Sequence, residues 1–544
     1  MNSKRKIVYL ALSLLVFAQA KAQISFGGMP RFIETKSQSN SIVTLSKISN
    51  DALLEEDINL IGKGSAMRTG VVRDVEYNNQ NNGNTINLDN GDRIWTLTIK
   101  SEGATFMSVA FKTFSIPASA ELYLYNSTKD FVIGKFTYES VLPNGEFYTQ
   151  SVPGDEITLE YYEPKEVAGM GKIEIAQVCH GYKNIFEMMD NQKGHHGNSE
   201  GNCHINVACE EGDAWRNQIR SVVAYEIIAG GYSYMCSGAL INNTSNDKTN
   251  YILSAYHCQD LNQTISRLVF YFNYQTRTCT GISGTYNNSV IGADIVAKNS
   301  ASDFLLLKLK NNIPDNYEVY YAGWSRSTAT PQVGACIHHP GGDWKKISIP
   351  SLVRSADANF WDVRWISGAN NKGVTEGGSS GSPLFNANGL IVGQLYAGAS
   401  ACEYINNSSY LYDYYGKISR SWTGGNTKTT RLKDWLDPNN TNANQLSGIN
   451  WDYEEDSVGI NTNIEQNTMN VYPNPSNGVL YVDINEMGQA EYAIYDMMGR
   501  KVQNSKMMLT SSTYQLKTSD LNEGTYILEI IVNGKKYTKT IIVK

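Results

Sequence analysis

Short segments in which apolar and polar residues alternate recur along most of this chain of 544 residues. In the first third they include RIWTLTIKS (93–101), ELYLYNS (121–127), EITLEYYEP (156–164) and GKIEIAQVC (171–179). Such alternation is typical of β-strands with one buried face. Helical periodicity is rare, and tyrosine, which favours strands, occurs 34 times. We therefore predict a mostly β protein.

The middle of the chain is again rich in predicted strands, and the tail repeats a strand–turn rhythm. The middle segments are SYMCSGALI (233–241), NYILSAYHC (250–258), RLVFYFNYQ (267–275), DFLLLKLK (303–310) and LIVGQLYAG (390–398). One short helix is predicted at TRLKDWLDP (430–438), where Pro438 ends it. The tail segments GVLYVDI, AEYAIYDMMGRKV and GTYILEIIVNGKKYTKTIIVK predict a small immunoglobulin-like β-sandwich.

Two polar stretches separate these regions. MMDNQKGHHGNSEGNC (188–203) is rich in glycine, and INWDYEEDSVGINTNIEQNTMN (449–470) is acidic and rich in asparagine, so both are interpreted as linkers. The predicted organisation is a leader, a β-rich N-terminal domain, a central domain, a linker and a C-terminal β-sandwich, at residues 1–22, 23–193, 194–449, 450–469 and 470–544.

The first 22 residues have the pattern of a signal peptide. Lys4, Arg5 and Lys6 precede an apolar run from Ile7 to Ala20, and the segment ends Ala-Lys-Ala. The run is too short to span a membrane, so we expect the mature protein to be exported and soluble. The formal net charge of −7, without a basic stripe, argues against nucleic acid as a partner.

Export changes the interpretation of the cysteines, since outside the cytoplasm they usually form disulfides. The chain has eight: Cys179, Cys203, Cys209, Cys236, Cys258, Cys279, Cys336 and Cys402. Their spacing alone leaves the pairing open.

The segment VTEGGSSGSPLF (374–385) surrounds two serines with glycines, which fits either a flexible turn or a nucleophile on a tight loop. Residues 377–381 formally match the G-x-S-x-G elbow of α/β-hydrolases, which requires a histidine after the serine. All seven histidines precede Ser379. That fold is therefore excluded, and the order histidine, aspartate, serine remains.

A histidine and an aspartate stand in suitable contexts upstream. His257 directly follows the apolar strand ILSA, and Asp303 opens the apolar run FLLLKL. A carboxylate buried there can accept the Nδ1–H of the histidine and stabilise its charged form. Asp260 and Asp294 are rivals, but neither opens such a run.

In this order, CSGALI, SAYHC, SDFLLLKL and GGSSGSP resemble segments of the chymotrypsin-like serine proteases. The closer similarity is to the lysyl endopeptidases, secreted bacterial members, and it runs from about Cys203 to Gly448 through NCHINVACEEGD, FNYQTRTC, AGWSR and IHHPGGDWKKIS. The resemblance implies a double β-barrel protease domain, and we expect the β-rich domain that precedes it to be a pro-domain.

The resemblance also implies the roles of individual residues. Ser380 would be the nucleophile of a triad with His257 and Asp303, and the backbone N–H groups of Gly378 and Ser380 would form the oxyanion hole. Ser379 stands where many members have an aspartate that anchors a newly cut N-terminus, so that salt bridge is not expected. The implied disulfides are Cys203–Cys402, Cys209–Cys279 and Cys236–Cys258.

Substrate specificity is predicted to depend on another carboxylate. Val374 stands where trypsin-like enzymes have their pocket aspartate, whereas Asp413, in SSYLYDYYGKI, takes the acidic place of the lysyl endopeptidases. Tyr396 replaces the histidine that those enzymes have near the pocket. Trp361 and Trp365 both remain open for the tryptophan that stacks in that family.

No metal or cofactor is predicted. The pair His338-His339 lacks the spacing of a metal motif, and the resembling family has the same pair without a metal role. The group His195, His196, Cys203, His204 and Cys209 mimics a zinc site, but disulfides are the better interpretation in an exported chain.

The tail has its own resemblance. VYPNPSNGVLYV, IYDMMGRKV, LNEGTYILEI and KKYTKTIIVK resemble the C-terminal sorting domain of type IX secretion substrates. This implies contact with outer-membrane secretion machinery and a secreted or cell-surface protein of a Gram-negative bacterium. The alternative interpretation is an ordinary adhesive β-sandwich.

We therefore expect a monomeric serine endopeptidase that acts on proteins or peptides and cleaves after lysine. The alternatives are a protease of broader Lys/Arg specificity and a catalytically silent, adhesin-type relative. Lys193 ends the segment MMDNQK, which leads to the further expectation that the enzyme removes its own pro-domain after this residue.

Overall fold

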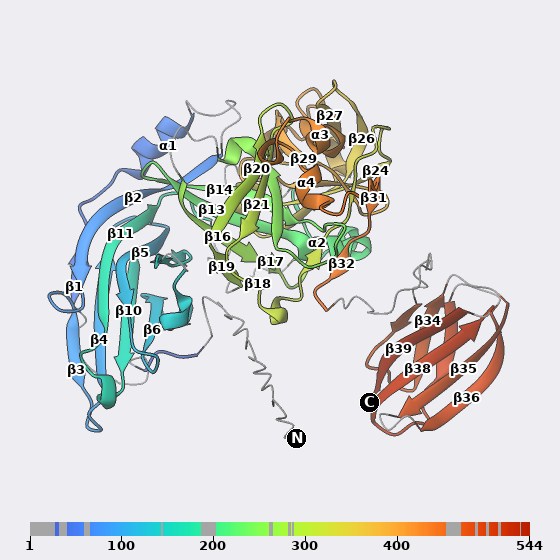
Figure 1. Ribbon diagram of the computed structural model, residues 1–544, viewed down its shortest axis with the longest axis horizontal. Helices are drawn as coiled ribbons and strands as arrows, with labels where there is room; N and C mark the ends of the chain where they lie inside the picture. The colour runs from blue at the N-terminus through green and yellow to red at the C-terminus, as the bar shows by residue number, and fades with distance from the viewer. Residues whose placement is uncertain are drawn as a thin grey trace, which may run out of the picture. The chain divides into compact units, whose positions relative to one another are not determined.

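The computed structural model shows a protein built mostly of β-strands, as predicted (Figure 1). The residues it describes are 28–31, 41–58, 66–142, 145–185, 203–259, 265–280, 284–285, 288–452, 469–484, 488–496, 500–509, 513–533 and 535–544. The expected signal peptide, Lys193 and nearly all of the linker 450–469 lie outside this part of the chain. The fold divides into two compact units, residues 1–454 and 455–544.

The first unit begins with two β-sheets that face each other. One has the order β1 (Ile42–Thr44), β4 (Arg93–Lys100), β10 (Glu156–Glu163), β6 (Glu121–Asn126) and β7 (Val132–Phe136), with β3 (Asn84–Asn87) on β4. The facing layer contains β2 (Met67–Asn78), β11 (Lys172–Gly181), β5 (Phe106–Ser115), β8 (Phe147–Tyr148) and β9 (Val152–Pro153). Leucine, isoleucine and phenylalanine side chains from the alternating strands fill the space between them, as the sequence pattern predicts.

A second pair of sheets follows in residues 203–452, consistent with a double-barrel protease domain. The first contains β13 (Val222–Ala229), β14 (Tyr232–Leu240), β15 (Tyr251–Ala255), β16 (Ile265–Phe272), β19 (Ser289–Ile291), β20 (Ala293–Asn299) and β21 (Phe304–Leu309). The second contains β24 (Val333–His338), β25 (Lys346–Ser348), β26 (Pro350–Ser355), β27 (Phe360–Trp365), β28 (Pro383–Asn386), β29 (Ile391–Gly398) and β30 (Tyr412–Lys417). Helix α4 (Lys433–Leu436) lies where the sequence predicts one.

The N-terminal sheets are continuous with the protease sheets. Strand β2 pairs with β11 on one side and with β14 on the other, so one hydrogen-bonded sheet runs from the N-terminal layer into the first barrel. Figure 1 shows the blue and cyan strands meeting the green strands at this point. One apolar core includes side chains from both regions, among them Phe106, Tyr148, Met235, Val269 and Tyr271.

The second unit is a β-sandwich, as predicted. One sheet has the strand order β33 (Met469–Tyr472), β34 (Val479–Ile484) and β37 (Thr513–Lys517). The other has the order β36 (Lys501–Leu509), β35 (Gly488–Asp496), β38 (Gly524–Val532) and β39 (Lys535–Val543). Alternate residues such as Leu480, Val482, Leu528 and Ile530 are buried between the sheets.

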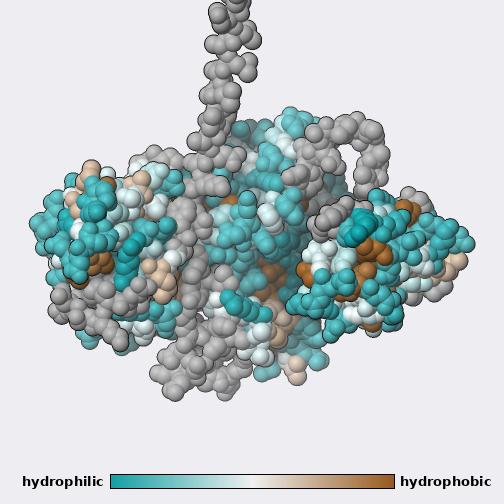
Figure 2. Space-filling model, turned by 90° about the horizontal axis from the view of Figure 1, so that it is seen from below, coloured by the Kyte–Doolittle hydropathy of each residue, from teal (hydrophilic) through white to brown (hydrophobic). Residues whose placement is uncertain are grey.

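The face of the molecule in Figure 2 is largely hydrophilic, and hydrophobic residues form small separate groups on it. In the described part of the chain, every helix is too short or too polar to cross a bilayer.

Candidate active site

The structure brings His257 and Asp303 together at the edge of the first barrel. His257 follows β15 in a short 3-10 turn, and Asp303 precedes β21, the partner strand of β15. The carboxylate of Asp303 contacts the histidine twice, accepting the backbone N–H at 3.0 Å and lying 2.9 Å from Nδ1. Both side chains are buried. The contact at Nδ1 fixes the ring so that Nε2 is free to act on another group.

Nε2 of His257 is buried and has no hydrogen-bond partner among the described residues. Two hydrogen bonds fix the backbone of Asp303. Its carbonyl accepts from the backbone N–H of Tyr256 at 2.8 Å and from the side-chain amide of Gln394 at 3.1 Å. Asp303 has a positive φ of 52°, which the sequence pattern did not predict. Gln394 lies on β29, so the second barrel helps to hold the acid of the first.

Ser380 lies on the loop before β28, and strand β14 holds this loop. The backbone N–H of Ser237 donates to the carbonyl of Ser380 at 2.8 Å, and the Ser237 hydroxyl donates to the carbonyl of Gly378 at 2.9 Å. A Cβ built on Gly381 would lie 2.8 Å from the backbone nitrogen of Ala255, two residues before His257. The serine loop therefore packs against the strand that leads to the histidine.

The glycines of this loop permit close packing and leave N–H groups unused. Gly378 has a φ of +89°, and a Cβ there would lie 2.8 Å from the carbonyl oxygen of His339. Among the described residues, no backbone carbonyl accepts a hydrogen bond from the N–H of Gly378 or of Ser380. Two unpaired N–H groups beside a serine are what an oxyanion hole requires.

A directed chain of hydrogen bonds anchors the loop in the absence of an aspartate. Ser348 donates to the carbonyl of Val374 at 3.0 Å, so its oxygen is left to accept from Nε2 of His338 at 2.9 Å. Nδ1 of His338 then accepts from the Ser379 hydroxyl at 2.7 Å, and Ser379 accepts from the backbone N–H of Glu376. Burial and nearby cationic groups hold the pKa of His338 well below its ordinary value. The neutral ring therefore serves as a structural link.

Asp413 lies on β30, where polar side chains enclose its carboxylate. The side chain is fully buried, and its Oδ2 accepts hydrogen bonds from three side chains: Trp365 Nε1 at 2.5 Å, Thr375 Oγ1 at 2.6 Å and Ser400 Oγ at 2.6 Å. Oδ1 faces Gly398, where a Cβ would collide with it. Burial raises the pKa of Asp413 to about 6, although the three donors oppose this shift. The three donors were not identified from the sequence, because they come from separate segments with no shared motif.

Tyr396 lies near the histidine, and its stacking partner differs from the two tryptophans proposed from sequence. The ring centroids of Tyr396 and His257 are 6.1 Å apart in an edge-on contact, and Phe360 stacks on Tyr396 at 4.9 Å. Trp365 instead donates to Asp413, and Trp361 is buried with its indole N–H donating to the carbonyl of Val392. The aromatic wall is therefore Phe360 and Tyr396.

The three predicted disulfides, Cys203–Cys402, Cys209–Cys279 and Cys236–Cys258, are all formed. Cys179 and Cys336 are free and buried, and burial raises the pKa of the Cys336 thiol to about 12. The third disulfide ties β14, which holds the serine loop, to the residue beside His257.

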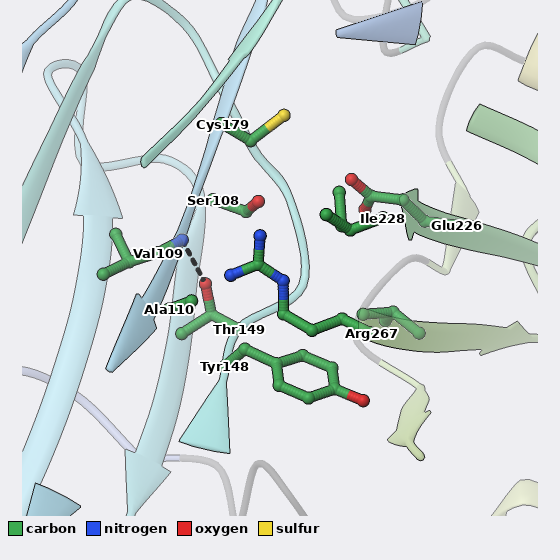
Figure 3. Close-up of a pocket in the computed structure, with 10 residues that line it drawn as sticks. Ser108, Val109, Ala110, Tyr148, Thr149, Cys179, Glu226, Ile228 and Arg267 are labelled. Atoms are coloured by element: carbon green, nitrogen blue, oxygen red, sulfur yellow. Dashed lines mark hydrogen bonds between the residues drawn. The ribbon is translucent and has the colours of Figure 1, made fainter. Parts of the chain in front are cut away.

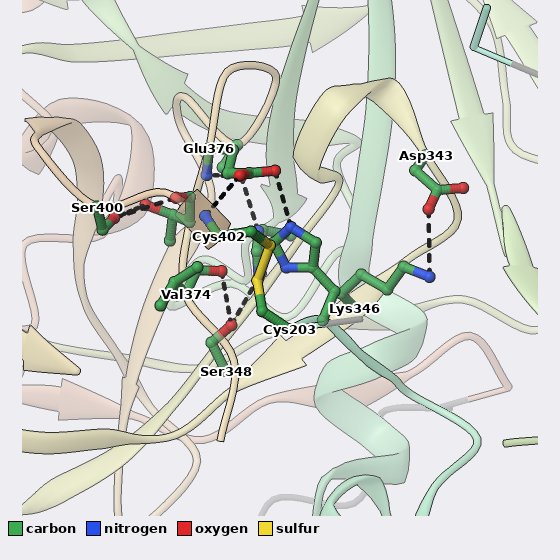
Figure 4. Close-up of polar contacts among 12 residues, drawn as sticks. Cys203, Asp343, Lys346, Ser348, Val374, Glu376, Ser400 and Cys402 are labelled. Carbon is green, nitrogen blue, oxygen red and sulfur yellow. Dashed lines mark hydrogen bonds and ion pairs between the residues drawn. A yellow bond between two sulfur atoms is a disulfide. The ribbon is translucent and has the colours of Figure 1, made fainter. Parts of the chain in front are cut away.

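The groups that mimic metal sites have other partners. Cys203, His204 and Cys402 lie close together, but the two sulfur atoms form a disulfide. His204 Nε2 lies 2.9 Å from Glu376, whose carboxylate also accepts the backbone N–H of Cys402 at 2.8 Å (Figure 4). His195 and His196 lie outside the described residues.

Fold and site together define a serine endopeptidase with a chymotrypsin-like double barrel. Residues 197–416 match the family described as "Lysyl endopeptidase, C-terminal domain", and residues 470–544 match "Secretion system C-terminal sorting domain". Residues 197–416 are thus similar to lysyl endopeptidases, and residues 470–544 to the sorting domains of type IX secretion, as the sequence motifs predict.

The chain is also similar to individual proteins. A lysyl endopeptidase of Pseudomonas aeruginosa is 28% identical over 372 residues, which cover 62% of this chain and 76% of the relative. Among solved structures, a Glu endopeptidase is 20% identical with a TM-score of 0.27, covering 40% of this chain and 92% of that one. The protease Anisep of Arthrobacter nicotinovorans is 15% identical with a TM-score of 0.27, and the match covers 36% of this chain and 90% of that one.

Proposed function

We propose that this protein is an exported endopeptidase that hydrolyses peptide bonds on the carboxyl side of lysine. The observation that carries the lysine preference is Asp413, a fully buried carboxylate beside Gly398 with one oxygen saturated by hydrogen bonds. In the proposed specificity pocket, the ammonium of a substrate lysine pairs with a charge that is otherwise costly to bury. A neutral side chain leaves that charge unpaired, so the pocket discriminates against it.

The chemistry follows from the other groups of the site. Nε2 of His257 takes the proton of the Ser380 hydroxyl as Oγ attacks the carbonyl carbon, while Asp303 holds the ring through Nδ1. The oxyanion is stabilised by the N–H groups of Gly378 and Ser380. The protonated histidine then gives its proton to the leaving amine, and water hydrolyses the acyl-enzyme by the same sequence of steps.

The test is a set of matched peptides that differ only in a Lys, Arg or Glu residue before the scissile bond. The proposal is supported if the lysine peptide is cleaved with the highest kcat/KM and if a Ser380→Ala variant cleaves none of the peptides. Equal cleavage after lysine and arginine indicates the broader specificity. Cleavage after glutamate, or activity that persists in the variant, contradicts the proposal.

We also assign the processing of the chain. The signal peptide (1–22) directs export, the sorting domain (470–544) is recognised by type IX secretion machinery, and residues 23–193 form a pro-domain that the enzyme removes after Lys193. Cleavage after lysine by an enzyme that prefers lysine requires no other protease.

A further inference from the structure

We propose that strand β2 of the N-terminal domain occupies the sheet edge needed by the substrate residues that follow the scissile bond, so that the uncut chain is latent. This inference rests on the proposed function and adds to it the means by which the N-terminal domain restrains the enzyme. The occupant is a segment of this same chain, Met67–Val71, paired with Tyr232–Met235 of β14.

The edge of β14 has three successive neighbours. Strand β2 pairs with it in antiparallel register as far as Met67 opposite Met235. Two residues further on, the N–H of Ser237 binds the carbonyl of Ser380, and beyond that β15 pairs with Ala239 and Leu240. The first residue of β2 therefore lies directly beside the position where the serine loop joins the strand.

The direction of a bound substrate follows from the position of the serine loop between the two barrels. On one side Ser380 is bonded to Ser237 of β14, and on the other the N–H of Gly381 donates to Leu395 of β29 at 2.9 Å. Asp413 lies on the β29 side, because it pairs with Gly398 at the end of that strand. A substrate whose lysine enters the Asp413 pocket therefore directs its following residues toward β14, where an extended peptide would add as a strand.

Strand β2 already fills that place. The side chain of Met67 packs on the serine loop, since a Cβ built on Gly377 would lie 3.4 Å from its Sδ atom. Ala66 is 5% exposed and belongs to the apolar cluster that includes Cys236 and Cys258, the disulfide beside His257. The start of β2 thus contacts Gly377, the residue before the proposed oxyanion hole.

Side chains of both domains complete the interface. Thr69 and Ser233 share a hydrogen bond of 3.1 Å, and the guanidinium of Arg68 lies 4.6 Å from the ring centre of Tyr232. Glu226 of β13 is buried, and its carboxylate accepts hydrogen bonds from Ser151 of the N-terminal domain at 3.0 Å and from the protease residues Ser233 and Tyr271.

The close-up in Figure 3 shows Arg267 of β16 pointing among Ser108, Thr149 and Tyr148 of the N-terminal domain. Close by, the hydroxyl of Tyr148 donates to the carbonyl of Leu268 at 3.1 Å. A buried polar interface of this kind fixes one register, because any shift leaves buried groups unpaired.

The serine loop itself is already anchored in the uncut chain. His338 holds Ser379 through a 2.7 Å hydrogen bond, and this contact needs no newly formed N-terminus. Latency therefore comes from coverage by β2, and cleavage acts by allowing this strand to leave.

The experiment uses the full chain with Lys193→Gln and a recognition sequence for an unrelated protease inserted after residue 193. Intact and cut forms are compared on a lysine ester with a small leaving group and on a peptide that extends four residues beyond the lysine. A tethered strand competes at an effective concentration of order mM, so we expect the intact form to cleave the extended peptide about 100-fold more slowly than the cut form. The two forms should hydrolyse the ester at similar rates.

The second part of the experiment uses substitutions in β2. Met67→Glu, or the milder Met67→Ala, should raise the rate of the intact form on the extended peptide toward that of the cut form. Glu76→Gln is the matched control, because Glu76 is exposed on the same strand beyond the pairing with β14. Equal rates of intact and cut forms on the extended peptide, or equal inhibition of ester and peptide, overturn the inference. A cut form inactive on both lysine substrates instead contradicts the proposed function.

Discussion

The backbone N–H of Ser237 donates to the carbonyl of Ser380 at 2.8 Å, and this contact joins the serine loop of the second barrel to a strand of the first. The same residue bonds Gly378 through its hydroxyl, which in turn accepts the N–H of His339. Its neighbour Cys236 is linked to Cys258, beside His257. Strand β14 therefore sets the position of the loop and of the histidine, and an element that pairs with the same edge of β14 as the serine loop lies next to that loop.

The adjacent serines should respond differently to substitution. Ser380→Ala removes the proposed nucleophile and should lower kcat by about 10⁶-fold, as for other serine proteases. Ser379→Ala removes a buried hydrogen bond to His338, which should cost about 1–3 kcal/mol of stability, so we expect this variant to unfold more easily but to keep much of its activity. Kinetics of both variants on a lysine peptide provide the measurement, and the reverse order would show that Ser379 is the nucleophile.

The preference for lysine should depend on pH. The pKa of Asp413 is raised to about 6, so the carboxyl is charged above this value and neutral below it. The ratio of kcat/KM for lysine and norleucine peptides should therefore fall as the pH decreases through about 6, while effects of the histidine cancel in the ratio. Thr375→Val removes a donor that lowers this pKa, so in this variant the pH at which the ratio is half-changed should be higher.

Asp413→Asn tests the same carboxylate directly. An amide cannot compensate a buried ammonium, so the ratio of kcat/KM for lysine and norleucine peptides should fall by about 10²- to 10³-fold at pH 8. Tyr396→His changes only the aromatic wall beside Phe360 and should have a far smaller effect. Small and equal effects of the two substitutions would indicate that another acid forms the pocket.

Processing should leave Gly194 as the mature N-terminus. N-terminal sequencing of the secreted protein should find this residue in the active enzyme, and a Ser380→Ala chain produced in the same way should lack it. An N-terminus at residue 23 in both proteins would identify residues 23–193 as a permanent domain.

Lys345 should make the protease domain less stable below neutral pH. Its ammonium group is buried and donates to the carbonyl of Ile219 at 2.7 Å, and burial lowers the pKa of Lys345 to about 7. The unfolded chain binds this proton more tightly, so the penalty is largest below pH 7 and disappears as the pH rises toward the unfolded value of 10.5. Lys345→Met should raise the thermal midpoint more at pH 6 than at pH 9, and an equal change at both would contradict this account.

The sequence by itself determined the strands, the order of the domains and the identity of the chemical groups. Alternation in segments such as 93–101 and 524–532 depends only on local period, and both segments are strands. The apolar segments beside His257 and Asp303 were enough to predict that these two residues pair, and the family resemblance supplied the correct disulfides.

Only the tertiary structure decided which side chains surround these groups. Trp365, Thr375 and Ser400 converge on Asp413 from separate segments, and Phe360 stacks on Tyr396 although two tryptophans stand nearby in the sequence. The pairing of β2 with β14 joins residues more than 150 positions apart, and no local pattern encodes which sheet edge an exposed strand will join. Such contacts depend on shape and unpaired backbone groups that exist only after the sheets have formed.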